Sequence, residues 1–127
     1  MAGRVARGGI ARGIARGDVR LYQFAPGSKA NDKTRLAIVL TSNSAIGYLP
    51  RSLSTVTVAP VTSTIRGVPS EVVLNEEDGM KSSCAVNLHN AVTVSQERLG
   101  RRGAQLSAAR INEVCAALRF SLGCDSN

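Results

Sequence analysis

Two stretches of this sequence combine residue types that could bind and activate a phosphate group. Arg35 opens the apolar run RLAIVL directly after a polar loop, so its guanidinium should emerge at a strand end and not inside the core. Thr62, Ser63 and Thr64 follow Pro60, which we expect to end the hydrogen-bond ladder of the preceding strand. Hydroxyls and unpaired backbone N–H groups at such a turn can donate to phosphate oxygens, and arginine supplies a bidentate, charge-assisted partner.

These groups suggest one reaction and one simpler role. An arginine, a threonine and turn amides that meet at one phosphate could stabilise the charge that develops in a phosphodiester transition state, without a metal ion. The hydroxyls could equally serve the turn alone, because serine and threonine often bond to nearby backbone at strand ends. The residue types by themselves leave both interpretations open.

Other chemistries find little support in the sequence. The single histidine, His89, lies in a strand-like context, and there is no G-x-S-x-G elbow, so a serine hydrolase is disfavoured. A glycine-rich phosphate loop is also missing. Cys84, Cys115 and Cys124 have neither C-x-x-C nor zinc spacing. We therefore expect no metal site and no cofactor, and we expect these thiols to be reduced and mostly buried.

The formal net charge of +7 is concentrated in two regions of the chain. Residues 1–16 hold four arginines and no acid, whereas residues 71–78 hold four acids. Between them, residues 29–66 hold Lys29, Lys33, Arg35, Arg51 and Arg66 against the single acid Asp32. A basic region of this kind would attract a polyanion such as a nucleic acid, although most charge clusters are simply solvated surface.

The elements that would position these residues are short strands followed by one helix. Alternating or continuous apolar runs predict strands over 18–24, 35–42, 53–61 and 70–74, and one or two more over 83–95. Composition predicts loops over 25–34 and 43–52 and an acidic turn over 75–82. Five to seven short strands and a C-terminal helix favour a small, strongly curved antiparallel barrel with the helix packed on it.

The C-terminal helix has clear signals at both ends. Ser107 is a suitable N-cap and Gly123 closes the helix as a C′ residue. Between them, apolar residues recur at helical spacing at Ile111, Val114, Cys115, Leu118 and Leu122.

The domain organisation follows from composition. Residues 1–15 form a degenerate Ala-Arg-Gly repeat that we expect to be a flexible tail, residues 16–124 one domain, and residues 125–127 a short C-terminal tail. No apolar run approaches the roughly 20 residues of a membrane helix, and the start has no apolar stretch of signal-peptide type. We therefore expect a cytoplasmic protein without a membrane partner.

Five short motifs, taken in order, resemble the MazF/PemK family of toxin endoribonucleases. They are RGDV at 16–19, RLAIVLTSN at 35–43, VAPVTSTIR at 58–66, ERLGRR at 97–102 and INEVCAALRFSLG at 111–123. They span roughly residues 16–124 at spacings compatible with the family. The resemblance implies a mainly β fold with a C-terminal helix, an SH3-like barrel of short antiparallel strands of the MazF/CcdB type, and a homodimer.

The same resemblance implies a sequence-specific, metal-independent endoribonuclease that cleaves single-stranded mRNA. The substrate's own 2′-hydroxyl would be the nucleophile, leaving 2′,3′-cyclic phosphate and 5′-hydroxyl ends. The family's key arginine and threonine correspond to Arg35 and Thr62. By that likeness Thr62 would position the scissile phosphate, and Arg35 would be a general acid or a phosphate clamp. Charge stabilisation is the safer role for Arg35, because the pKa of an arginine exceeds about 12.

The resemblance also suggests which residues contact RNA. Ser28 matches a family residue that lines the RNA groove, and Asn90 falls where the family often has a base-contacting glutamine. The full set of expected RNA-binding residues is Ser28, Lys29, Lys33, Ser63, Thr64, Arg66 and Asn90. The toxins of this family are held in check by an antitoxin, so the resemblance also implies a cognate MazE-like partner with an acidic tail that covers the RNA groove.

The chain departs from the family pattern at several positions. Arg20 stands where an aromatic residue is usual after R-G-D-V, and Leu36 replaces the proline after the catalytic arginine. Lys29 and Ala30 replace acidic or glutamine positions, and Val92 replaces an arginine. The core pair is kept while its surroundings differ, which is typical of an active enzyme with an altered recognition sequence.

Two non-enzymatic interpretations remain open. One is a toxin of the same fold that poisons DNA gyrase through its C-terminal residues, although the tail SLGCDSN lacks an aromatic anchor for such a contact. The other is a catalytically inactive module that binds RNA or protein.

Overall fold

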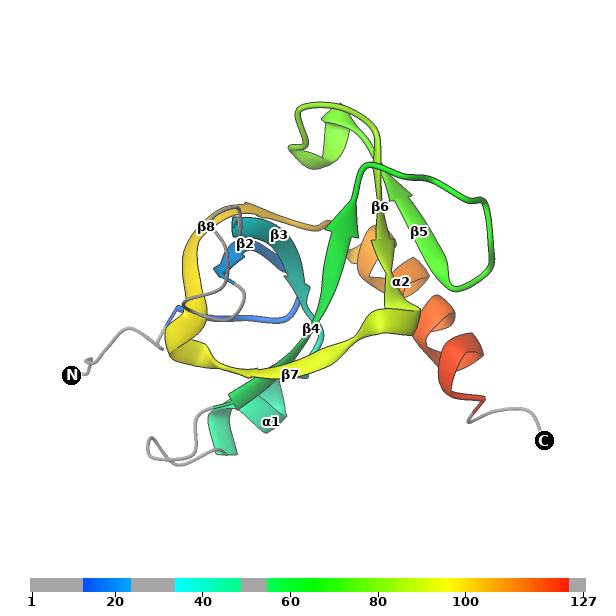
Figure 1. Ribbon diagram of the computed structural model, residues 1–127. Coiled ribbons are helices and arrows are strands. Elements are labelled where there is room, and N and C mark those ends of the chain that lie inside the picture. The colour runs from blue at the N-terminus through cyan, green and yellow to red at the C-terminus, as the bar shows by residue number, and fades with distance from the viewer. Residues whose placement is uncertain (1–12, 24–33, 49–54, 124–127) are drawn as a thin grey trace.

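The computed structural model describes residues 13–23, 34–48 and 55–123, which form a coiled antiparallel sheet with a C-terminal helix beside it (Figure 1). Its strands are β2 (Asp18–Gln23), β3 (Thr34–Val39), β4 (Thr55–Thr62), β5 (Glu71–Leu74), β6 (Cys84–Asn87), β7 (Val92–Ser95) and β8 (Leu99–Gln105). Its helices are the short α1 (Asn43–Tyr48) and the longer α2 (Ala108–Leu122). Three short 3-10 turns complete it: η3 (Glu76–Asp78), η4 (Leu88–Asn90) and η5 (Gln96–Arg98).

Strand β4 is the centre of the sheet because it pairs with three neighbours in succession. The strand order is β5-β6-β4-β3-β2-β8, and β7 also pairs with β4. Residues 55–58 of β4 pair with β7, residues 58–60 with β3, and residues 61–62 with β6. Pro60 therefore does not end the ladder, as its missing N–H led us to expect, but marks the point where β4 leaves β3 and joins β6.

The aliphatic core forms two clusters on the two faces of the coiled sheet. Along β3, Ile38 belongs to one cluster, while Ala37 and Val39 belong to the other. This alternation confirms a strand buried on both faces over residues 37–39. The strand ends at Val39, so the predicted strand at 35–42 is too long by its last three residues. The larger cluster also receives Val114 and Ala117 from α2.

Helix α2 begins and ends where its caps predict. The Ser107 side chain accepts a hydrogen bond from the Arg110 amide (3.2 Å), and Gly123 adopts a left-handed φ of 69° while its N–H donates to the Arg119 carbonyl. The helix packs against β5 and η4. Leu122 is 66% exposed, so the core face of the helix ends before this residue, contrary to our expectation.

Two other segments differ from the prediction. The expected loop at 43–52 contains helix α1, whose first turn is capped by the Ser42 hydroxyl accepting from the Ala45 amide (3.1 Å). Strand β8 lies in a segment for which the sequence pattern predicts no strand. Residues 83–95 form two strands separated by η4, which confirms the prediction of one or two strands there.

At the N-terminus, the packed part of the domain begins earlier in the chain than the sequence predicted. Ile14 is buried against the second core cluster, so packing begins before residue 16, the boundary that the sequence suggested. Residues 1–12 of the expected N-terminal tail, residues 25–33 of the first predicted loop and the C-terminal tail lie outside the described residues. None of the helices in the described ranges is long and apolar enough to cross a membrane.

Candidate functional site

The site lies where strands β3 and β4 separate. Their pairing ends at Ala37 and Pro60, and continuing the same register would place Arg35 opposite Thr62. That pair is not formed: Thr62 instead pairs with Ala85 of β6, and Arg35 pairs with Tyr22 of β2, each on the edge of its strand away from the other. The two strands are thus held from their outer sides, and a gap opens between residues 35–36 and residues 61–62.

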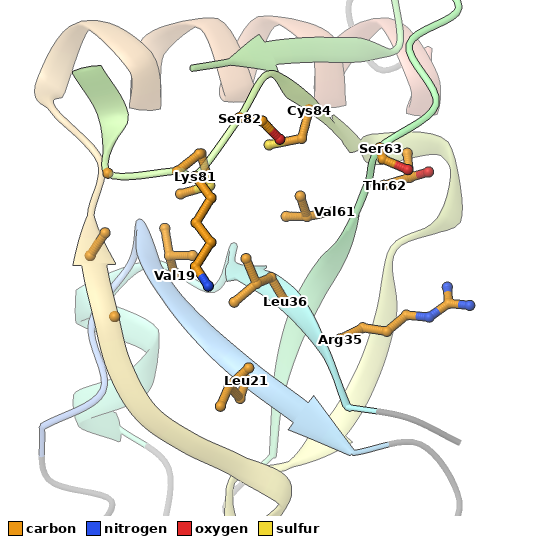
Figure 2. A pocket seen from close by; sticks show the side chains of 14 residues that line it. Val19, Leu21, Arg35, Leu36, Val61, Thr62, Ser63, Lys81, Ser82 and Cys84 are labelled. Atoms are coloured by element: carbon orange, nitrogen blue, oxygen red, sulfur yellow. The ribbon is translucent and has the colours of Figure 1, made fainter. Parts of the chain in front are cut away.

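Strand alternation sorts the side chains at this gap into two groups. Leu36 and Val61 point into the gap, toward the larger core cluster, which both contact. Arg35 and Thr62 point to the opposite face, where the guanidinium and the hydroxyl lie on the same rim of the gap (Figure 2). Arg35 is exposed and Thr62 is half-buried, so the expectation that Arg35 emerges at a strand end is confirmed.

A cavity of about 700 Å³ fills the gap behind this rim. Its floor is formed by aliphatic side chains of β2, β3 and β4, and its far wall by the connection between η3 and β6 (Figure 2). The lining residues are Val19, Leu21, Arg35, Leu36, Val61, Thr62, Ser63, Gly79, Met80, Lys81, Ser82, Cys84, Gly103 and Ala104. Within this described lining, two residues are cationic and none is acidic, so the cavity favours an anionic ligand.

The turn after β4 has a defined local structure. The Thr62 Oγ1 atom accepts a hydrogen bond from the Thr64 amide (3.1 Å), which is the turn chemistry considered above. Because a hydroxyl has one donor and two acceptor lone pairs, this bond orients Oγ1 and leaves its O–H able to donate to a ligand. Farther along the loop, the Glu71 carboxylate accepts from the amides of Arg66 and Gly67, each at 3.0 Å.

The structure brings together only part of the expected RNA-binding set. Ser63 lines the cavity next to the proposed catalytic pair. Thr64, Arg66 and Asn90 are exposed but do not line it. Ser28, Lys29 and Lys33 lie outside the described residues.

Sequence reasoning missed the far wall of the cavity, which includes Lys81, Ser82 and Cys84. We had taken this segment only as an acidic turn, and no short motif marks it. Burial raises the pKa of the Cys84 thiol, and the nearby negative charge of Asp78 raises it further. Cys84 is therefore a neutral thiol near pH 7, and it is poorly suited to act as a base or a nucleophile.

The far wall is anchored to helix α2 through Asp78. Its carboxylate accepts from the Asn75 amide (2.9 Å) in a capping box and from Arg110 Nε (3.0 Å). Burial alone would raise the pKa of Asp78, but the hydrogen bonds from Arg110 and Asn75 and the Arg110 charge together lower it. Gly79 follows with a left-handed φ of 93°, which turns the chain toward Lys81.

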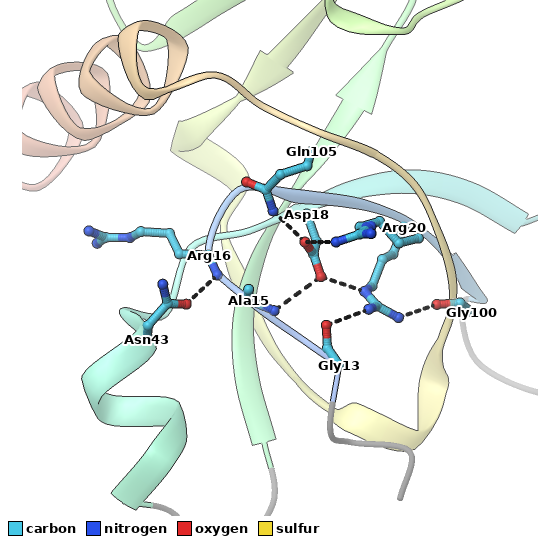
Figure 3. A network of polar contacts seen from close by, with 9 residues as sticks. Gly13, Ala15, Arg16, Asp18, Arg20, Asn43, Gly100 and Gln105 are labelled. Atoms are coloured by element: carbon cyan, nitrogen blue, oxygen red, sulfur yellow. Dashed lines mark hydrogen bonds and ion pairs between the residues drawn. The ribbon is translucent and has the colours of Figure 1, made fainter.

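The face of β2 that points away from the cavity is held by the buried carboxylate of Asp18 (Figure 3). Asp18 is fully buried and accepts from the Ala15 amide, from Arg20 Nε (2.9 Å) and from Gln105 Nε2. The Arg20 guanidinium also donates to the carbonyls of Gly100 (2.8 Å) and Gly13 (2.9 Å). The arginine that departs from the family pattern thus clamps β2 to β8 and to the N-terminal segment.

This network supports the cavity without lining it. Asp18 and Arg20 lie on one face of β2, whereas Val19 and Leu21 on the other face line the cavity. Arg16 adds a further tie, since its Nε donates to the Leu40 carbonyl (2.9 Å). In the part of the chain that the structure describes, no three His, Cys, Asp or Glu side chains are placed to hold a metal ion.

Comparisons with known proteins agree with the motifs. A family model described as "PemK-like, MazF-like toxin of type II toxin-antitoxin system" matches residues 15–122. The chain is 40% identical over 91 residues to the Mycobacterium tuberculosis protein named "Probable endoribonuclease MazF5", covering 71% of this chain and 80% of that protein. It is 33% identical over 79 residues to "Endoribonuclease MazF3" of the same organism, covering 62% and 73%.

Solved structures match over most of the chain. The Mycobacterium tuberculosis toxin MazF-mt6 superposes with a TM-score of 0.69 at 26% identity, covering 84% of this chain and 96% of that chain. A mycobacterial endoribonuclease in complex with its cognate antitoxin superposes with a TM-score of 0.73 at 21% identity, covering 90% and 99%, a likeness of fold alone. The mainly β fold with a C-terminal helix that the sequence predicted is therefore confirmed.

Proposed function

The chain belongs to the PemK-like, MazF-like family of type II toxin-antitoxin toxins, and from this premise we propose that it is a sequence-specific, metal-independent endoribonuclease acting on single-stranded mRNA. The observation that carries the proposal is the position of Arg35 and Thr62. They come from strands that separate at Pro60, yet they lie on one rim beside a cationic cavity without acids in its described lining. That rim suits a phosphodiester with one neighbouring base in the cavity.

In the proposed reaction the substrate supplies its own nucleophile. The 2′-oxygen forms a bond to phosphorus as the bond from phosphorus to the 5′-oxygen breaks, which gives a 2′,3′-cyclic phosphate and a 5′-hydroxyl. Arg35 stabilises the negative charge that grows on the phosphoryl oxygens, and the Thr62 O–H donates to one of them and fixes its position. The 2′-hydroxyl proton passes to water, and the leaving 5′-oxygen takes a proton from water, so the proposed step balances without a side-chain base.

We extend the proposal to the partners of the protein. The solved relative bound to its cognate antitoxin supports control of this chain by an antitoxin. An acidic, extended antitoxin tail fits the cationic rim, where it would exclude RNA from Arg35. We also propose a homodimer, which size-exclusion chromatography with light scattering tests directly.

The test is incubation of the purified protein with a long RNA in excess EDTA, followed by mapping of the new 5′ ends. We expect discrete 5′-hydroxyl ends at a short recurring sequence. Arg35→Ala should lower kcat/KM by about 100-fold or more, since removing one preorganised charge donor typically costs this much. Arg101→Ala is the matched control, because it removes the same charge from an exposed residue that neither lines the cavity nor belongs to the expected RNA-binding set.

The possible results are distinct. Discrete ends that vanish in Arg35→Ala and persist in Arg101→Ala would support the proposal. Intact RNA from well-folded wild-type protein would refute it and favour an inactive binding module or a protein-targeting toxin. Equal loss in both variants would mean that Arg35 contributes only to general electrostatic attraction.

A further inference from the structure

The cavity behind Arg35 and Thr62 has the size and position to hold one nucleobase. Its volume of about 700 Å³ lies within the range of small-ligand pockets. If the proposed function holds, the scissile phosphate sits on the rim, and the base of an adjoining nucleotide is the part of the substrate nearest to the cavity. The following inference rests on that function and concerns which base the cavity accepts.

The cavity floor can bind a base but cannot tell one base from another. It is built from aliphatic side chains, among them Val19, Leu36 and Val61, and the described lining includes no aromatic ring. Packing against such a floor removes apolar base surface from water without contacting the polar base edges. Discrimination must therefore come from the polar groups around the floor.

Lys81 is the polar group best placed for this task. It extends from the far wall, and Figure 2 shows its ammonium above the floor between Val19 and Leu36. Among the described residues, none forms an ion pair with Lys81, and the acid closest to it in sequence, Asp78, is bound to Arg110. The ammonium is thus directed into the cavity while its hydrogen-bonding groups remain available to a ligand.

The chemistry of a lysine restricts which base edge it can meet. An ammonium has three donors and no acceptor. Guanine presents two adjacent acceptors, O6 and N7, and uracil presents the O4 acceptor. Adenine presents N7 beside an amino donor, and cytosine presents an amino donor. The ammonium can therefore donate to guanine through two acceptors, whereas at adenine or cytosine the amino group faces it with a second donor and contacts are lost.

We propose that Lys81 is a specificity-determining residue, which selects guanine or uracil in this cavity at a nucleotide that flanks the cleaved bond. Arg35 and Thr62 act on the phosphate of any sequence, whereas Lys81 acts on the base edge. The neighbouring hydroxyls of Ser63 and Ser82 can donate or accept, so they add contacts without a preference of their own.

The experiment compares wild-type protein with Lys81→Met, which keeps the aliphatic stem and removes the three donors. Both are given RNA pools randomised on each side of the cleaved bond, and kcat/KM is obtained for every base by sequencing. At one flanking position we expect wild-type protein to prefer guanine or uracil by about tenfold, the size of one good base contact. Lys81→Met should reduce this preference to less than about twofold while its cleavage of adenine and cytosine substrates stays nearly unchanged.

Two controls separate base selection from other roles. Lys81→Arg keeps the donors and should keep the preference. Lys81 is exposed, so Lys81→Met should retain the wild-type melting temperature, which shows that a lost preference is not a lost fold. Arg35→Ala, in contrast, should lower cleavage of all sequences alike.

Three results would overturn the proposal. A uniform loss across all sequences, with a salt dependence weaker by about one charge, would show that Lys81 binds a phosphate. Equal cleavage of all four bases by wild-type protein at both flanking positions would show that the cavity does not select. Absence of Arg35-dependent cleavage would remove the proposed function itself, and this inference would fall with it.

Discussion

The pair Asp18–Arg20 allows a quantitative test of how the cavity floor is held. Asp18 is fully buried, and the Arg20 side chain is only 12% exposed, with 2.9 Å between Arg20 Nε and the carboxylate. Replacing Asp18 by alanine leaves the Arg20 guanidinium largely buried without its counter-charge. It also leaves the Ala15 amide and the Gln105 side chain without their acceptor.

The burial of this ion pair determines how much stability Asp18→Ala should lose. Breaking a buried ion pair by removing one partner costs about 3–5 kcal/mol. Asp18→Ala should therefore lower the free energy of unfolding by about 4 kcal/mol, a large part of the roughly 5–15 kcal/mol typical of a domain. Arg20→Met should be nearly as harmful, because it also removes the bonds to the Gly13 and Gly100 carbonyls. The double variant should lose less than the sum, with a coupling energy of about 2 kcal/mol.

The assay is urea unfolding of the wild-type protein, both single variants and the double variant, with the m-value as a check on two-state behaviour. Arg102→Met is the matched control. Its guanidinium lies 4.0 Å from Asp18, but its side chain is 54% exposed, so we expect a loss below about 1 kcal/mol. The reasoning is refuted if Asp18→Ala costs no more than Arg102→Met, or if the Asp18 and Arg20 effects simply add.

Three further predictions concern the cavity's supports. The pKa of Asp78 is lower in the folded protein than in the unfolded chain, where it is about 3.9. The ionised Asp78 carboxylate therefore stabilises the fold fully above the unfolded pKa. This stabilisation is lost as the pH falls through the lower pKa of the folded protein. Asp78→Asn should therefore reduce stability at pH 7 and flatten the acid limb of a stability–pH profile, and an unchanged limb would contradict this. Gly17→Ala should destabilise the protein by more than Gly67→Ala in thermal unfolding. Both glycines have positive φ, but a Cβ at residue 17 would lie 2.7 Å from Ile111 Cδ1, whereas nothing lies within 4 Å at residue 67. Cys84→Ala should leave kcat/KM within about threefold near pH 7, because the raised pKa keeps the thiol neutral; a loss of 100-fold or more would assign it a role in the reaction.

Local signals in the sequence were sufficient to predict several elements. The caps Ser107 and Gly123 and the apolar spacing between them predict α2, and the continuous apolar run predicts β3. Strand β8 was missed because LGRRGAQ has two glycines and two arginines and lacks regular alternation, which is typical of an exposed strand. Helix α1 was missed because six residues are too few to show a period, although Ser42 is a normal cap.

Some residues of the candidate site could likewise be predicted from the sequence, and others could not. Arg35 and Thr62 could be proposed from residue type and motif, because each lies at the end of a recognisable strand. Lys81 could not, since its role depends on the connection between η3 and β6 folding back over strands that are distant in sequence. The support given by Arg20 was equally hidden, because it requires the pairing of β2 with β8.

The site exists because β4 exchanges partners at Pro60. Beyond that residue, β3 remains paired with β2 while β4 pairs with β6, so the backbones of both strands are held on their outer sides. The gap between them therefore does not require flexible loops to stay open. Its two walls carry Arg35 and Thr62 at fixed positions on one rim. Electrostatic stabilisation of a transition state depends on donors that are already in place before charge develops. Two strands that are held on their outer edges would supply such preorganisation to the proposed reaction.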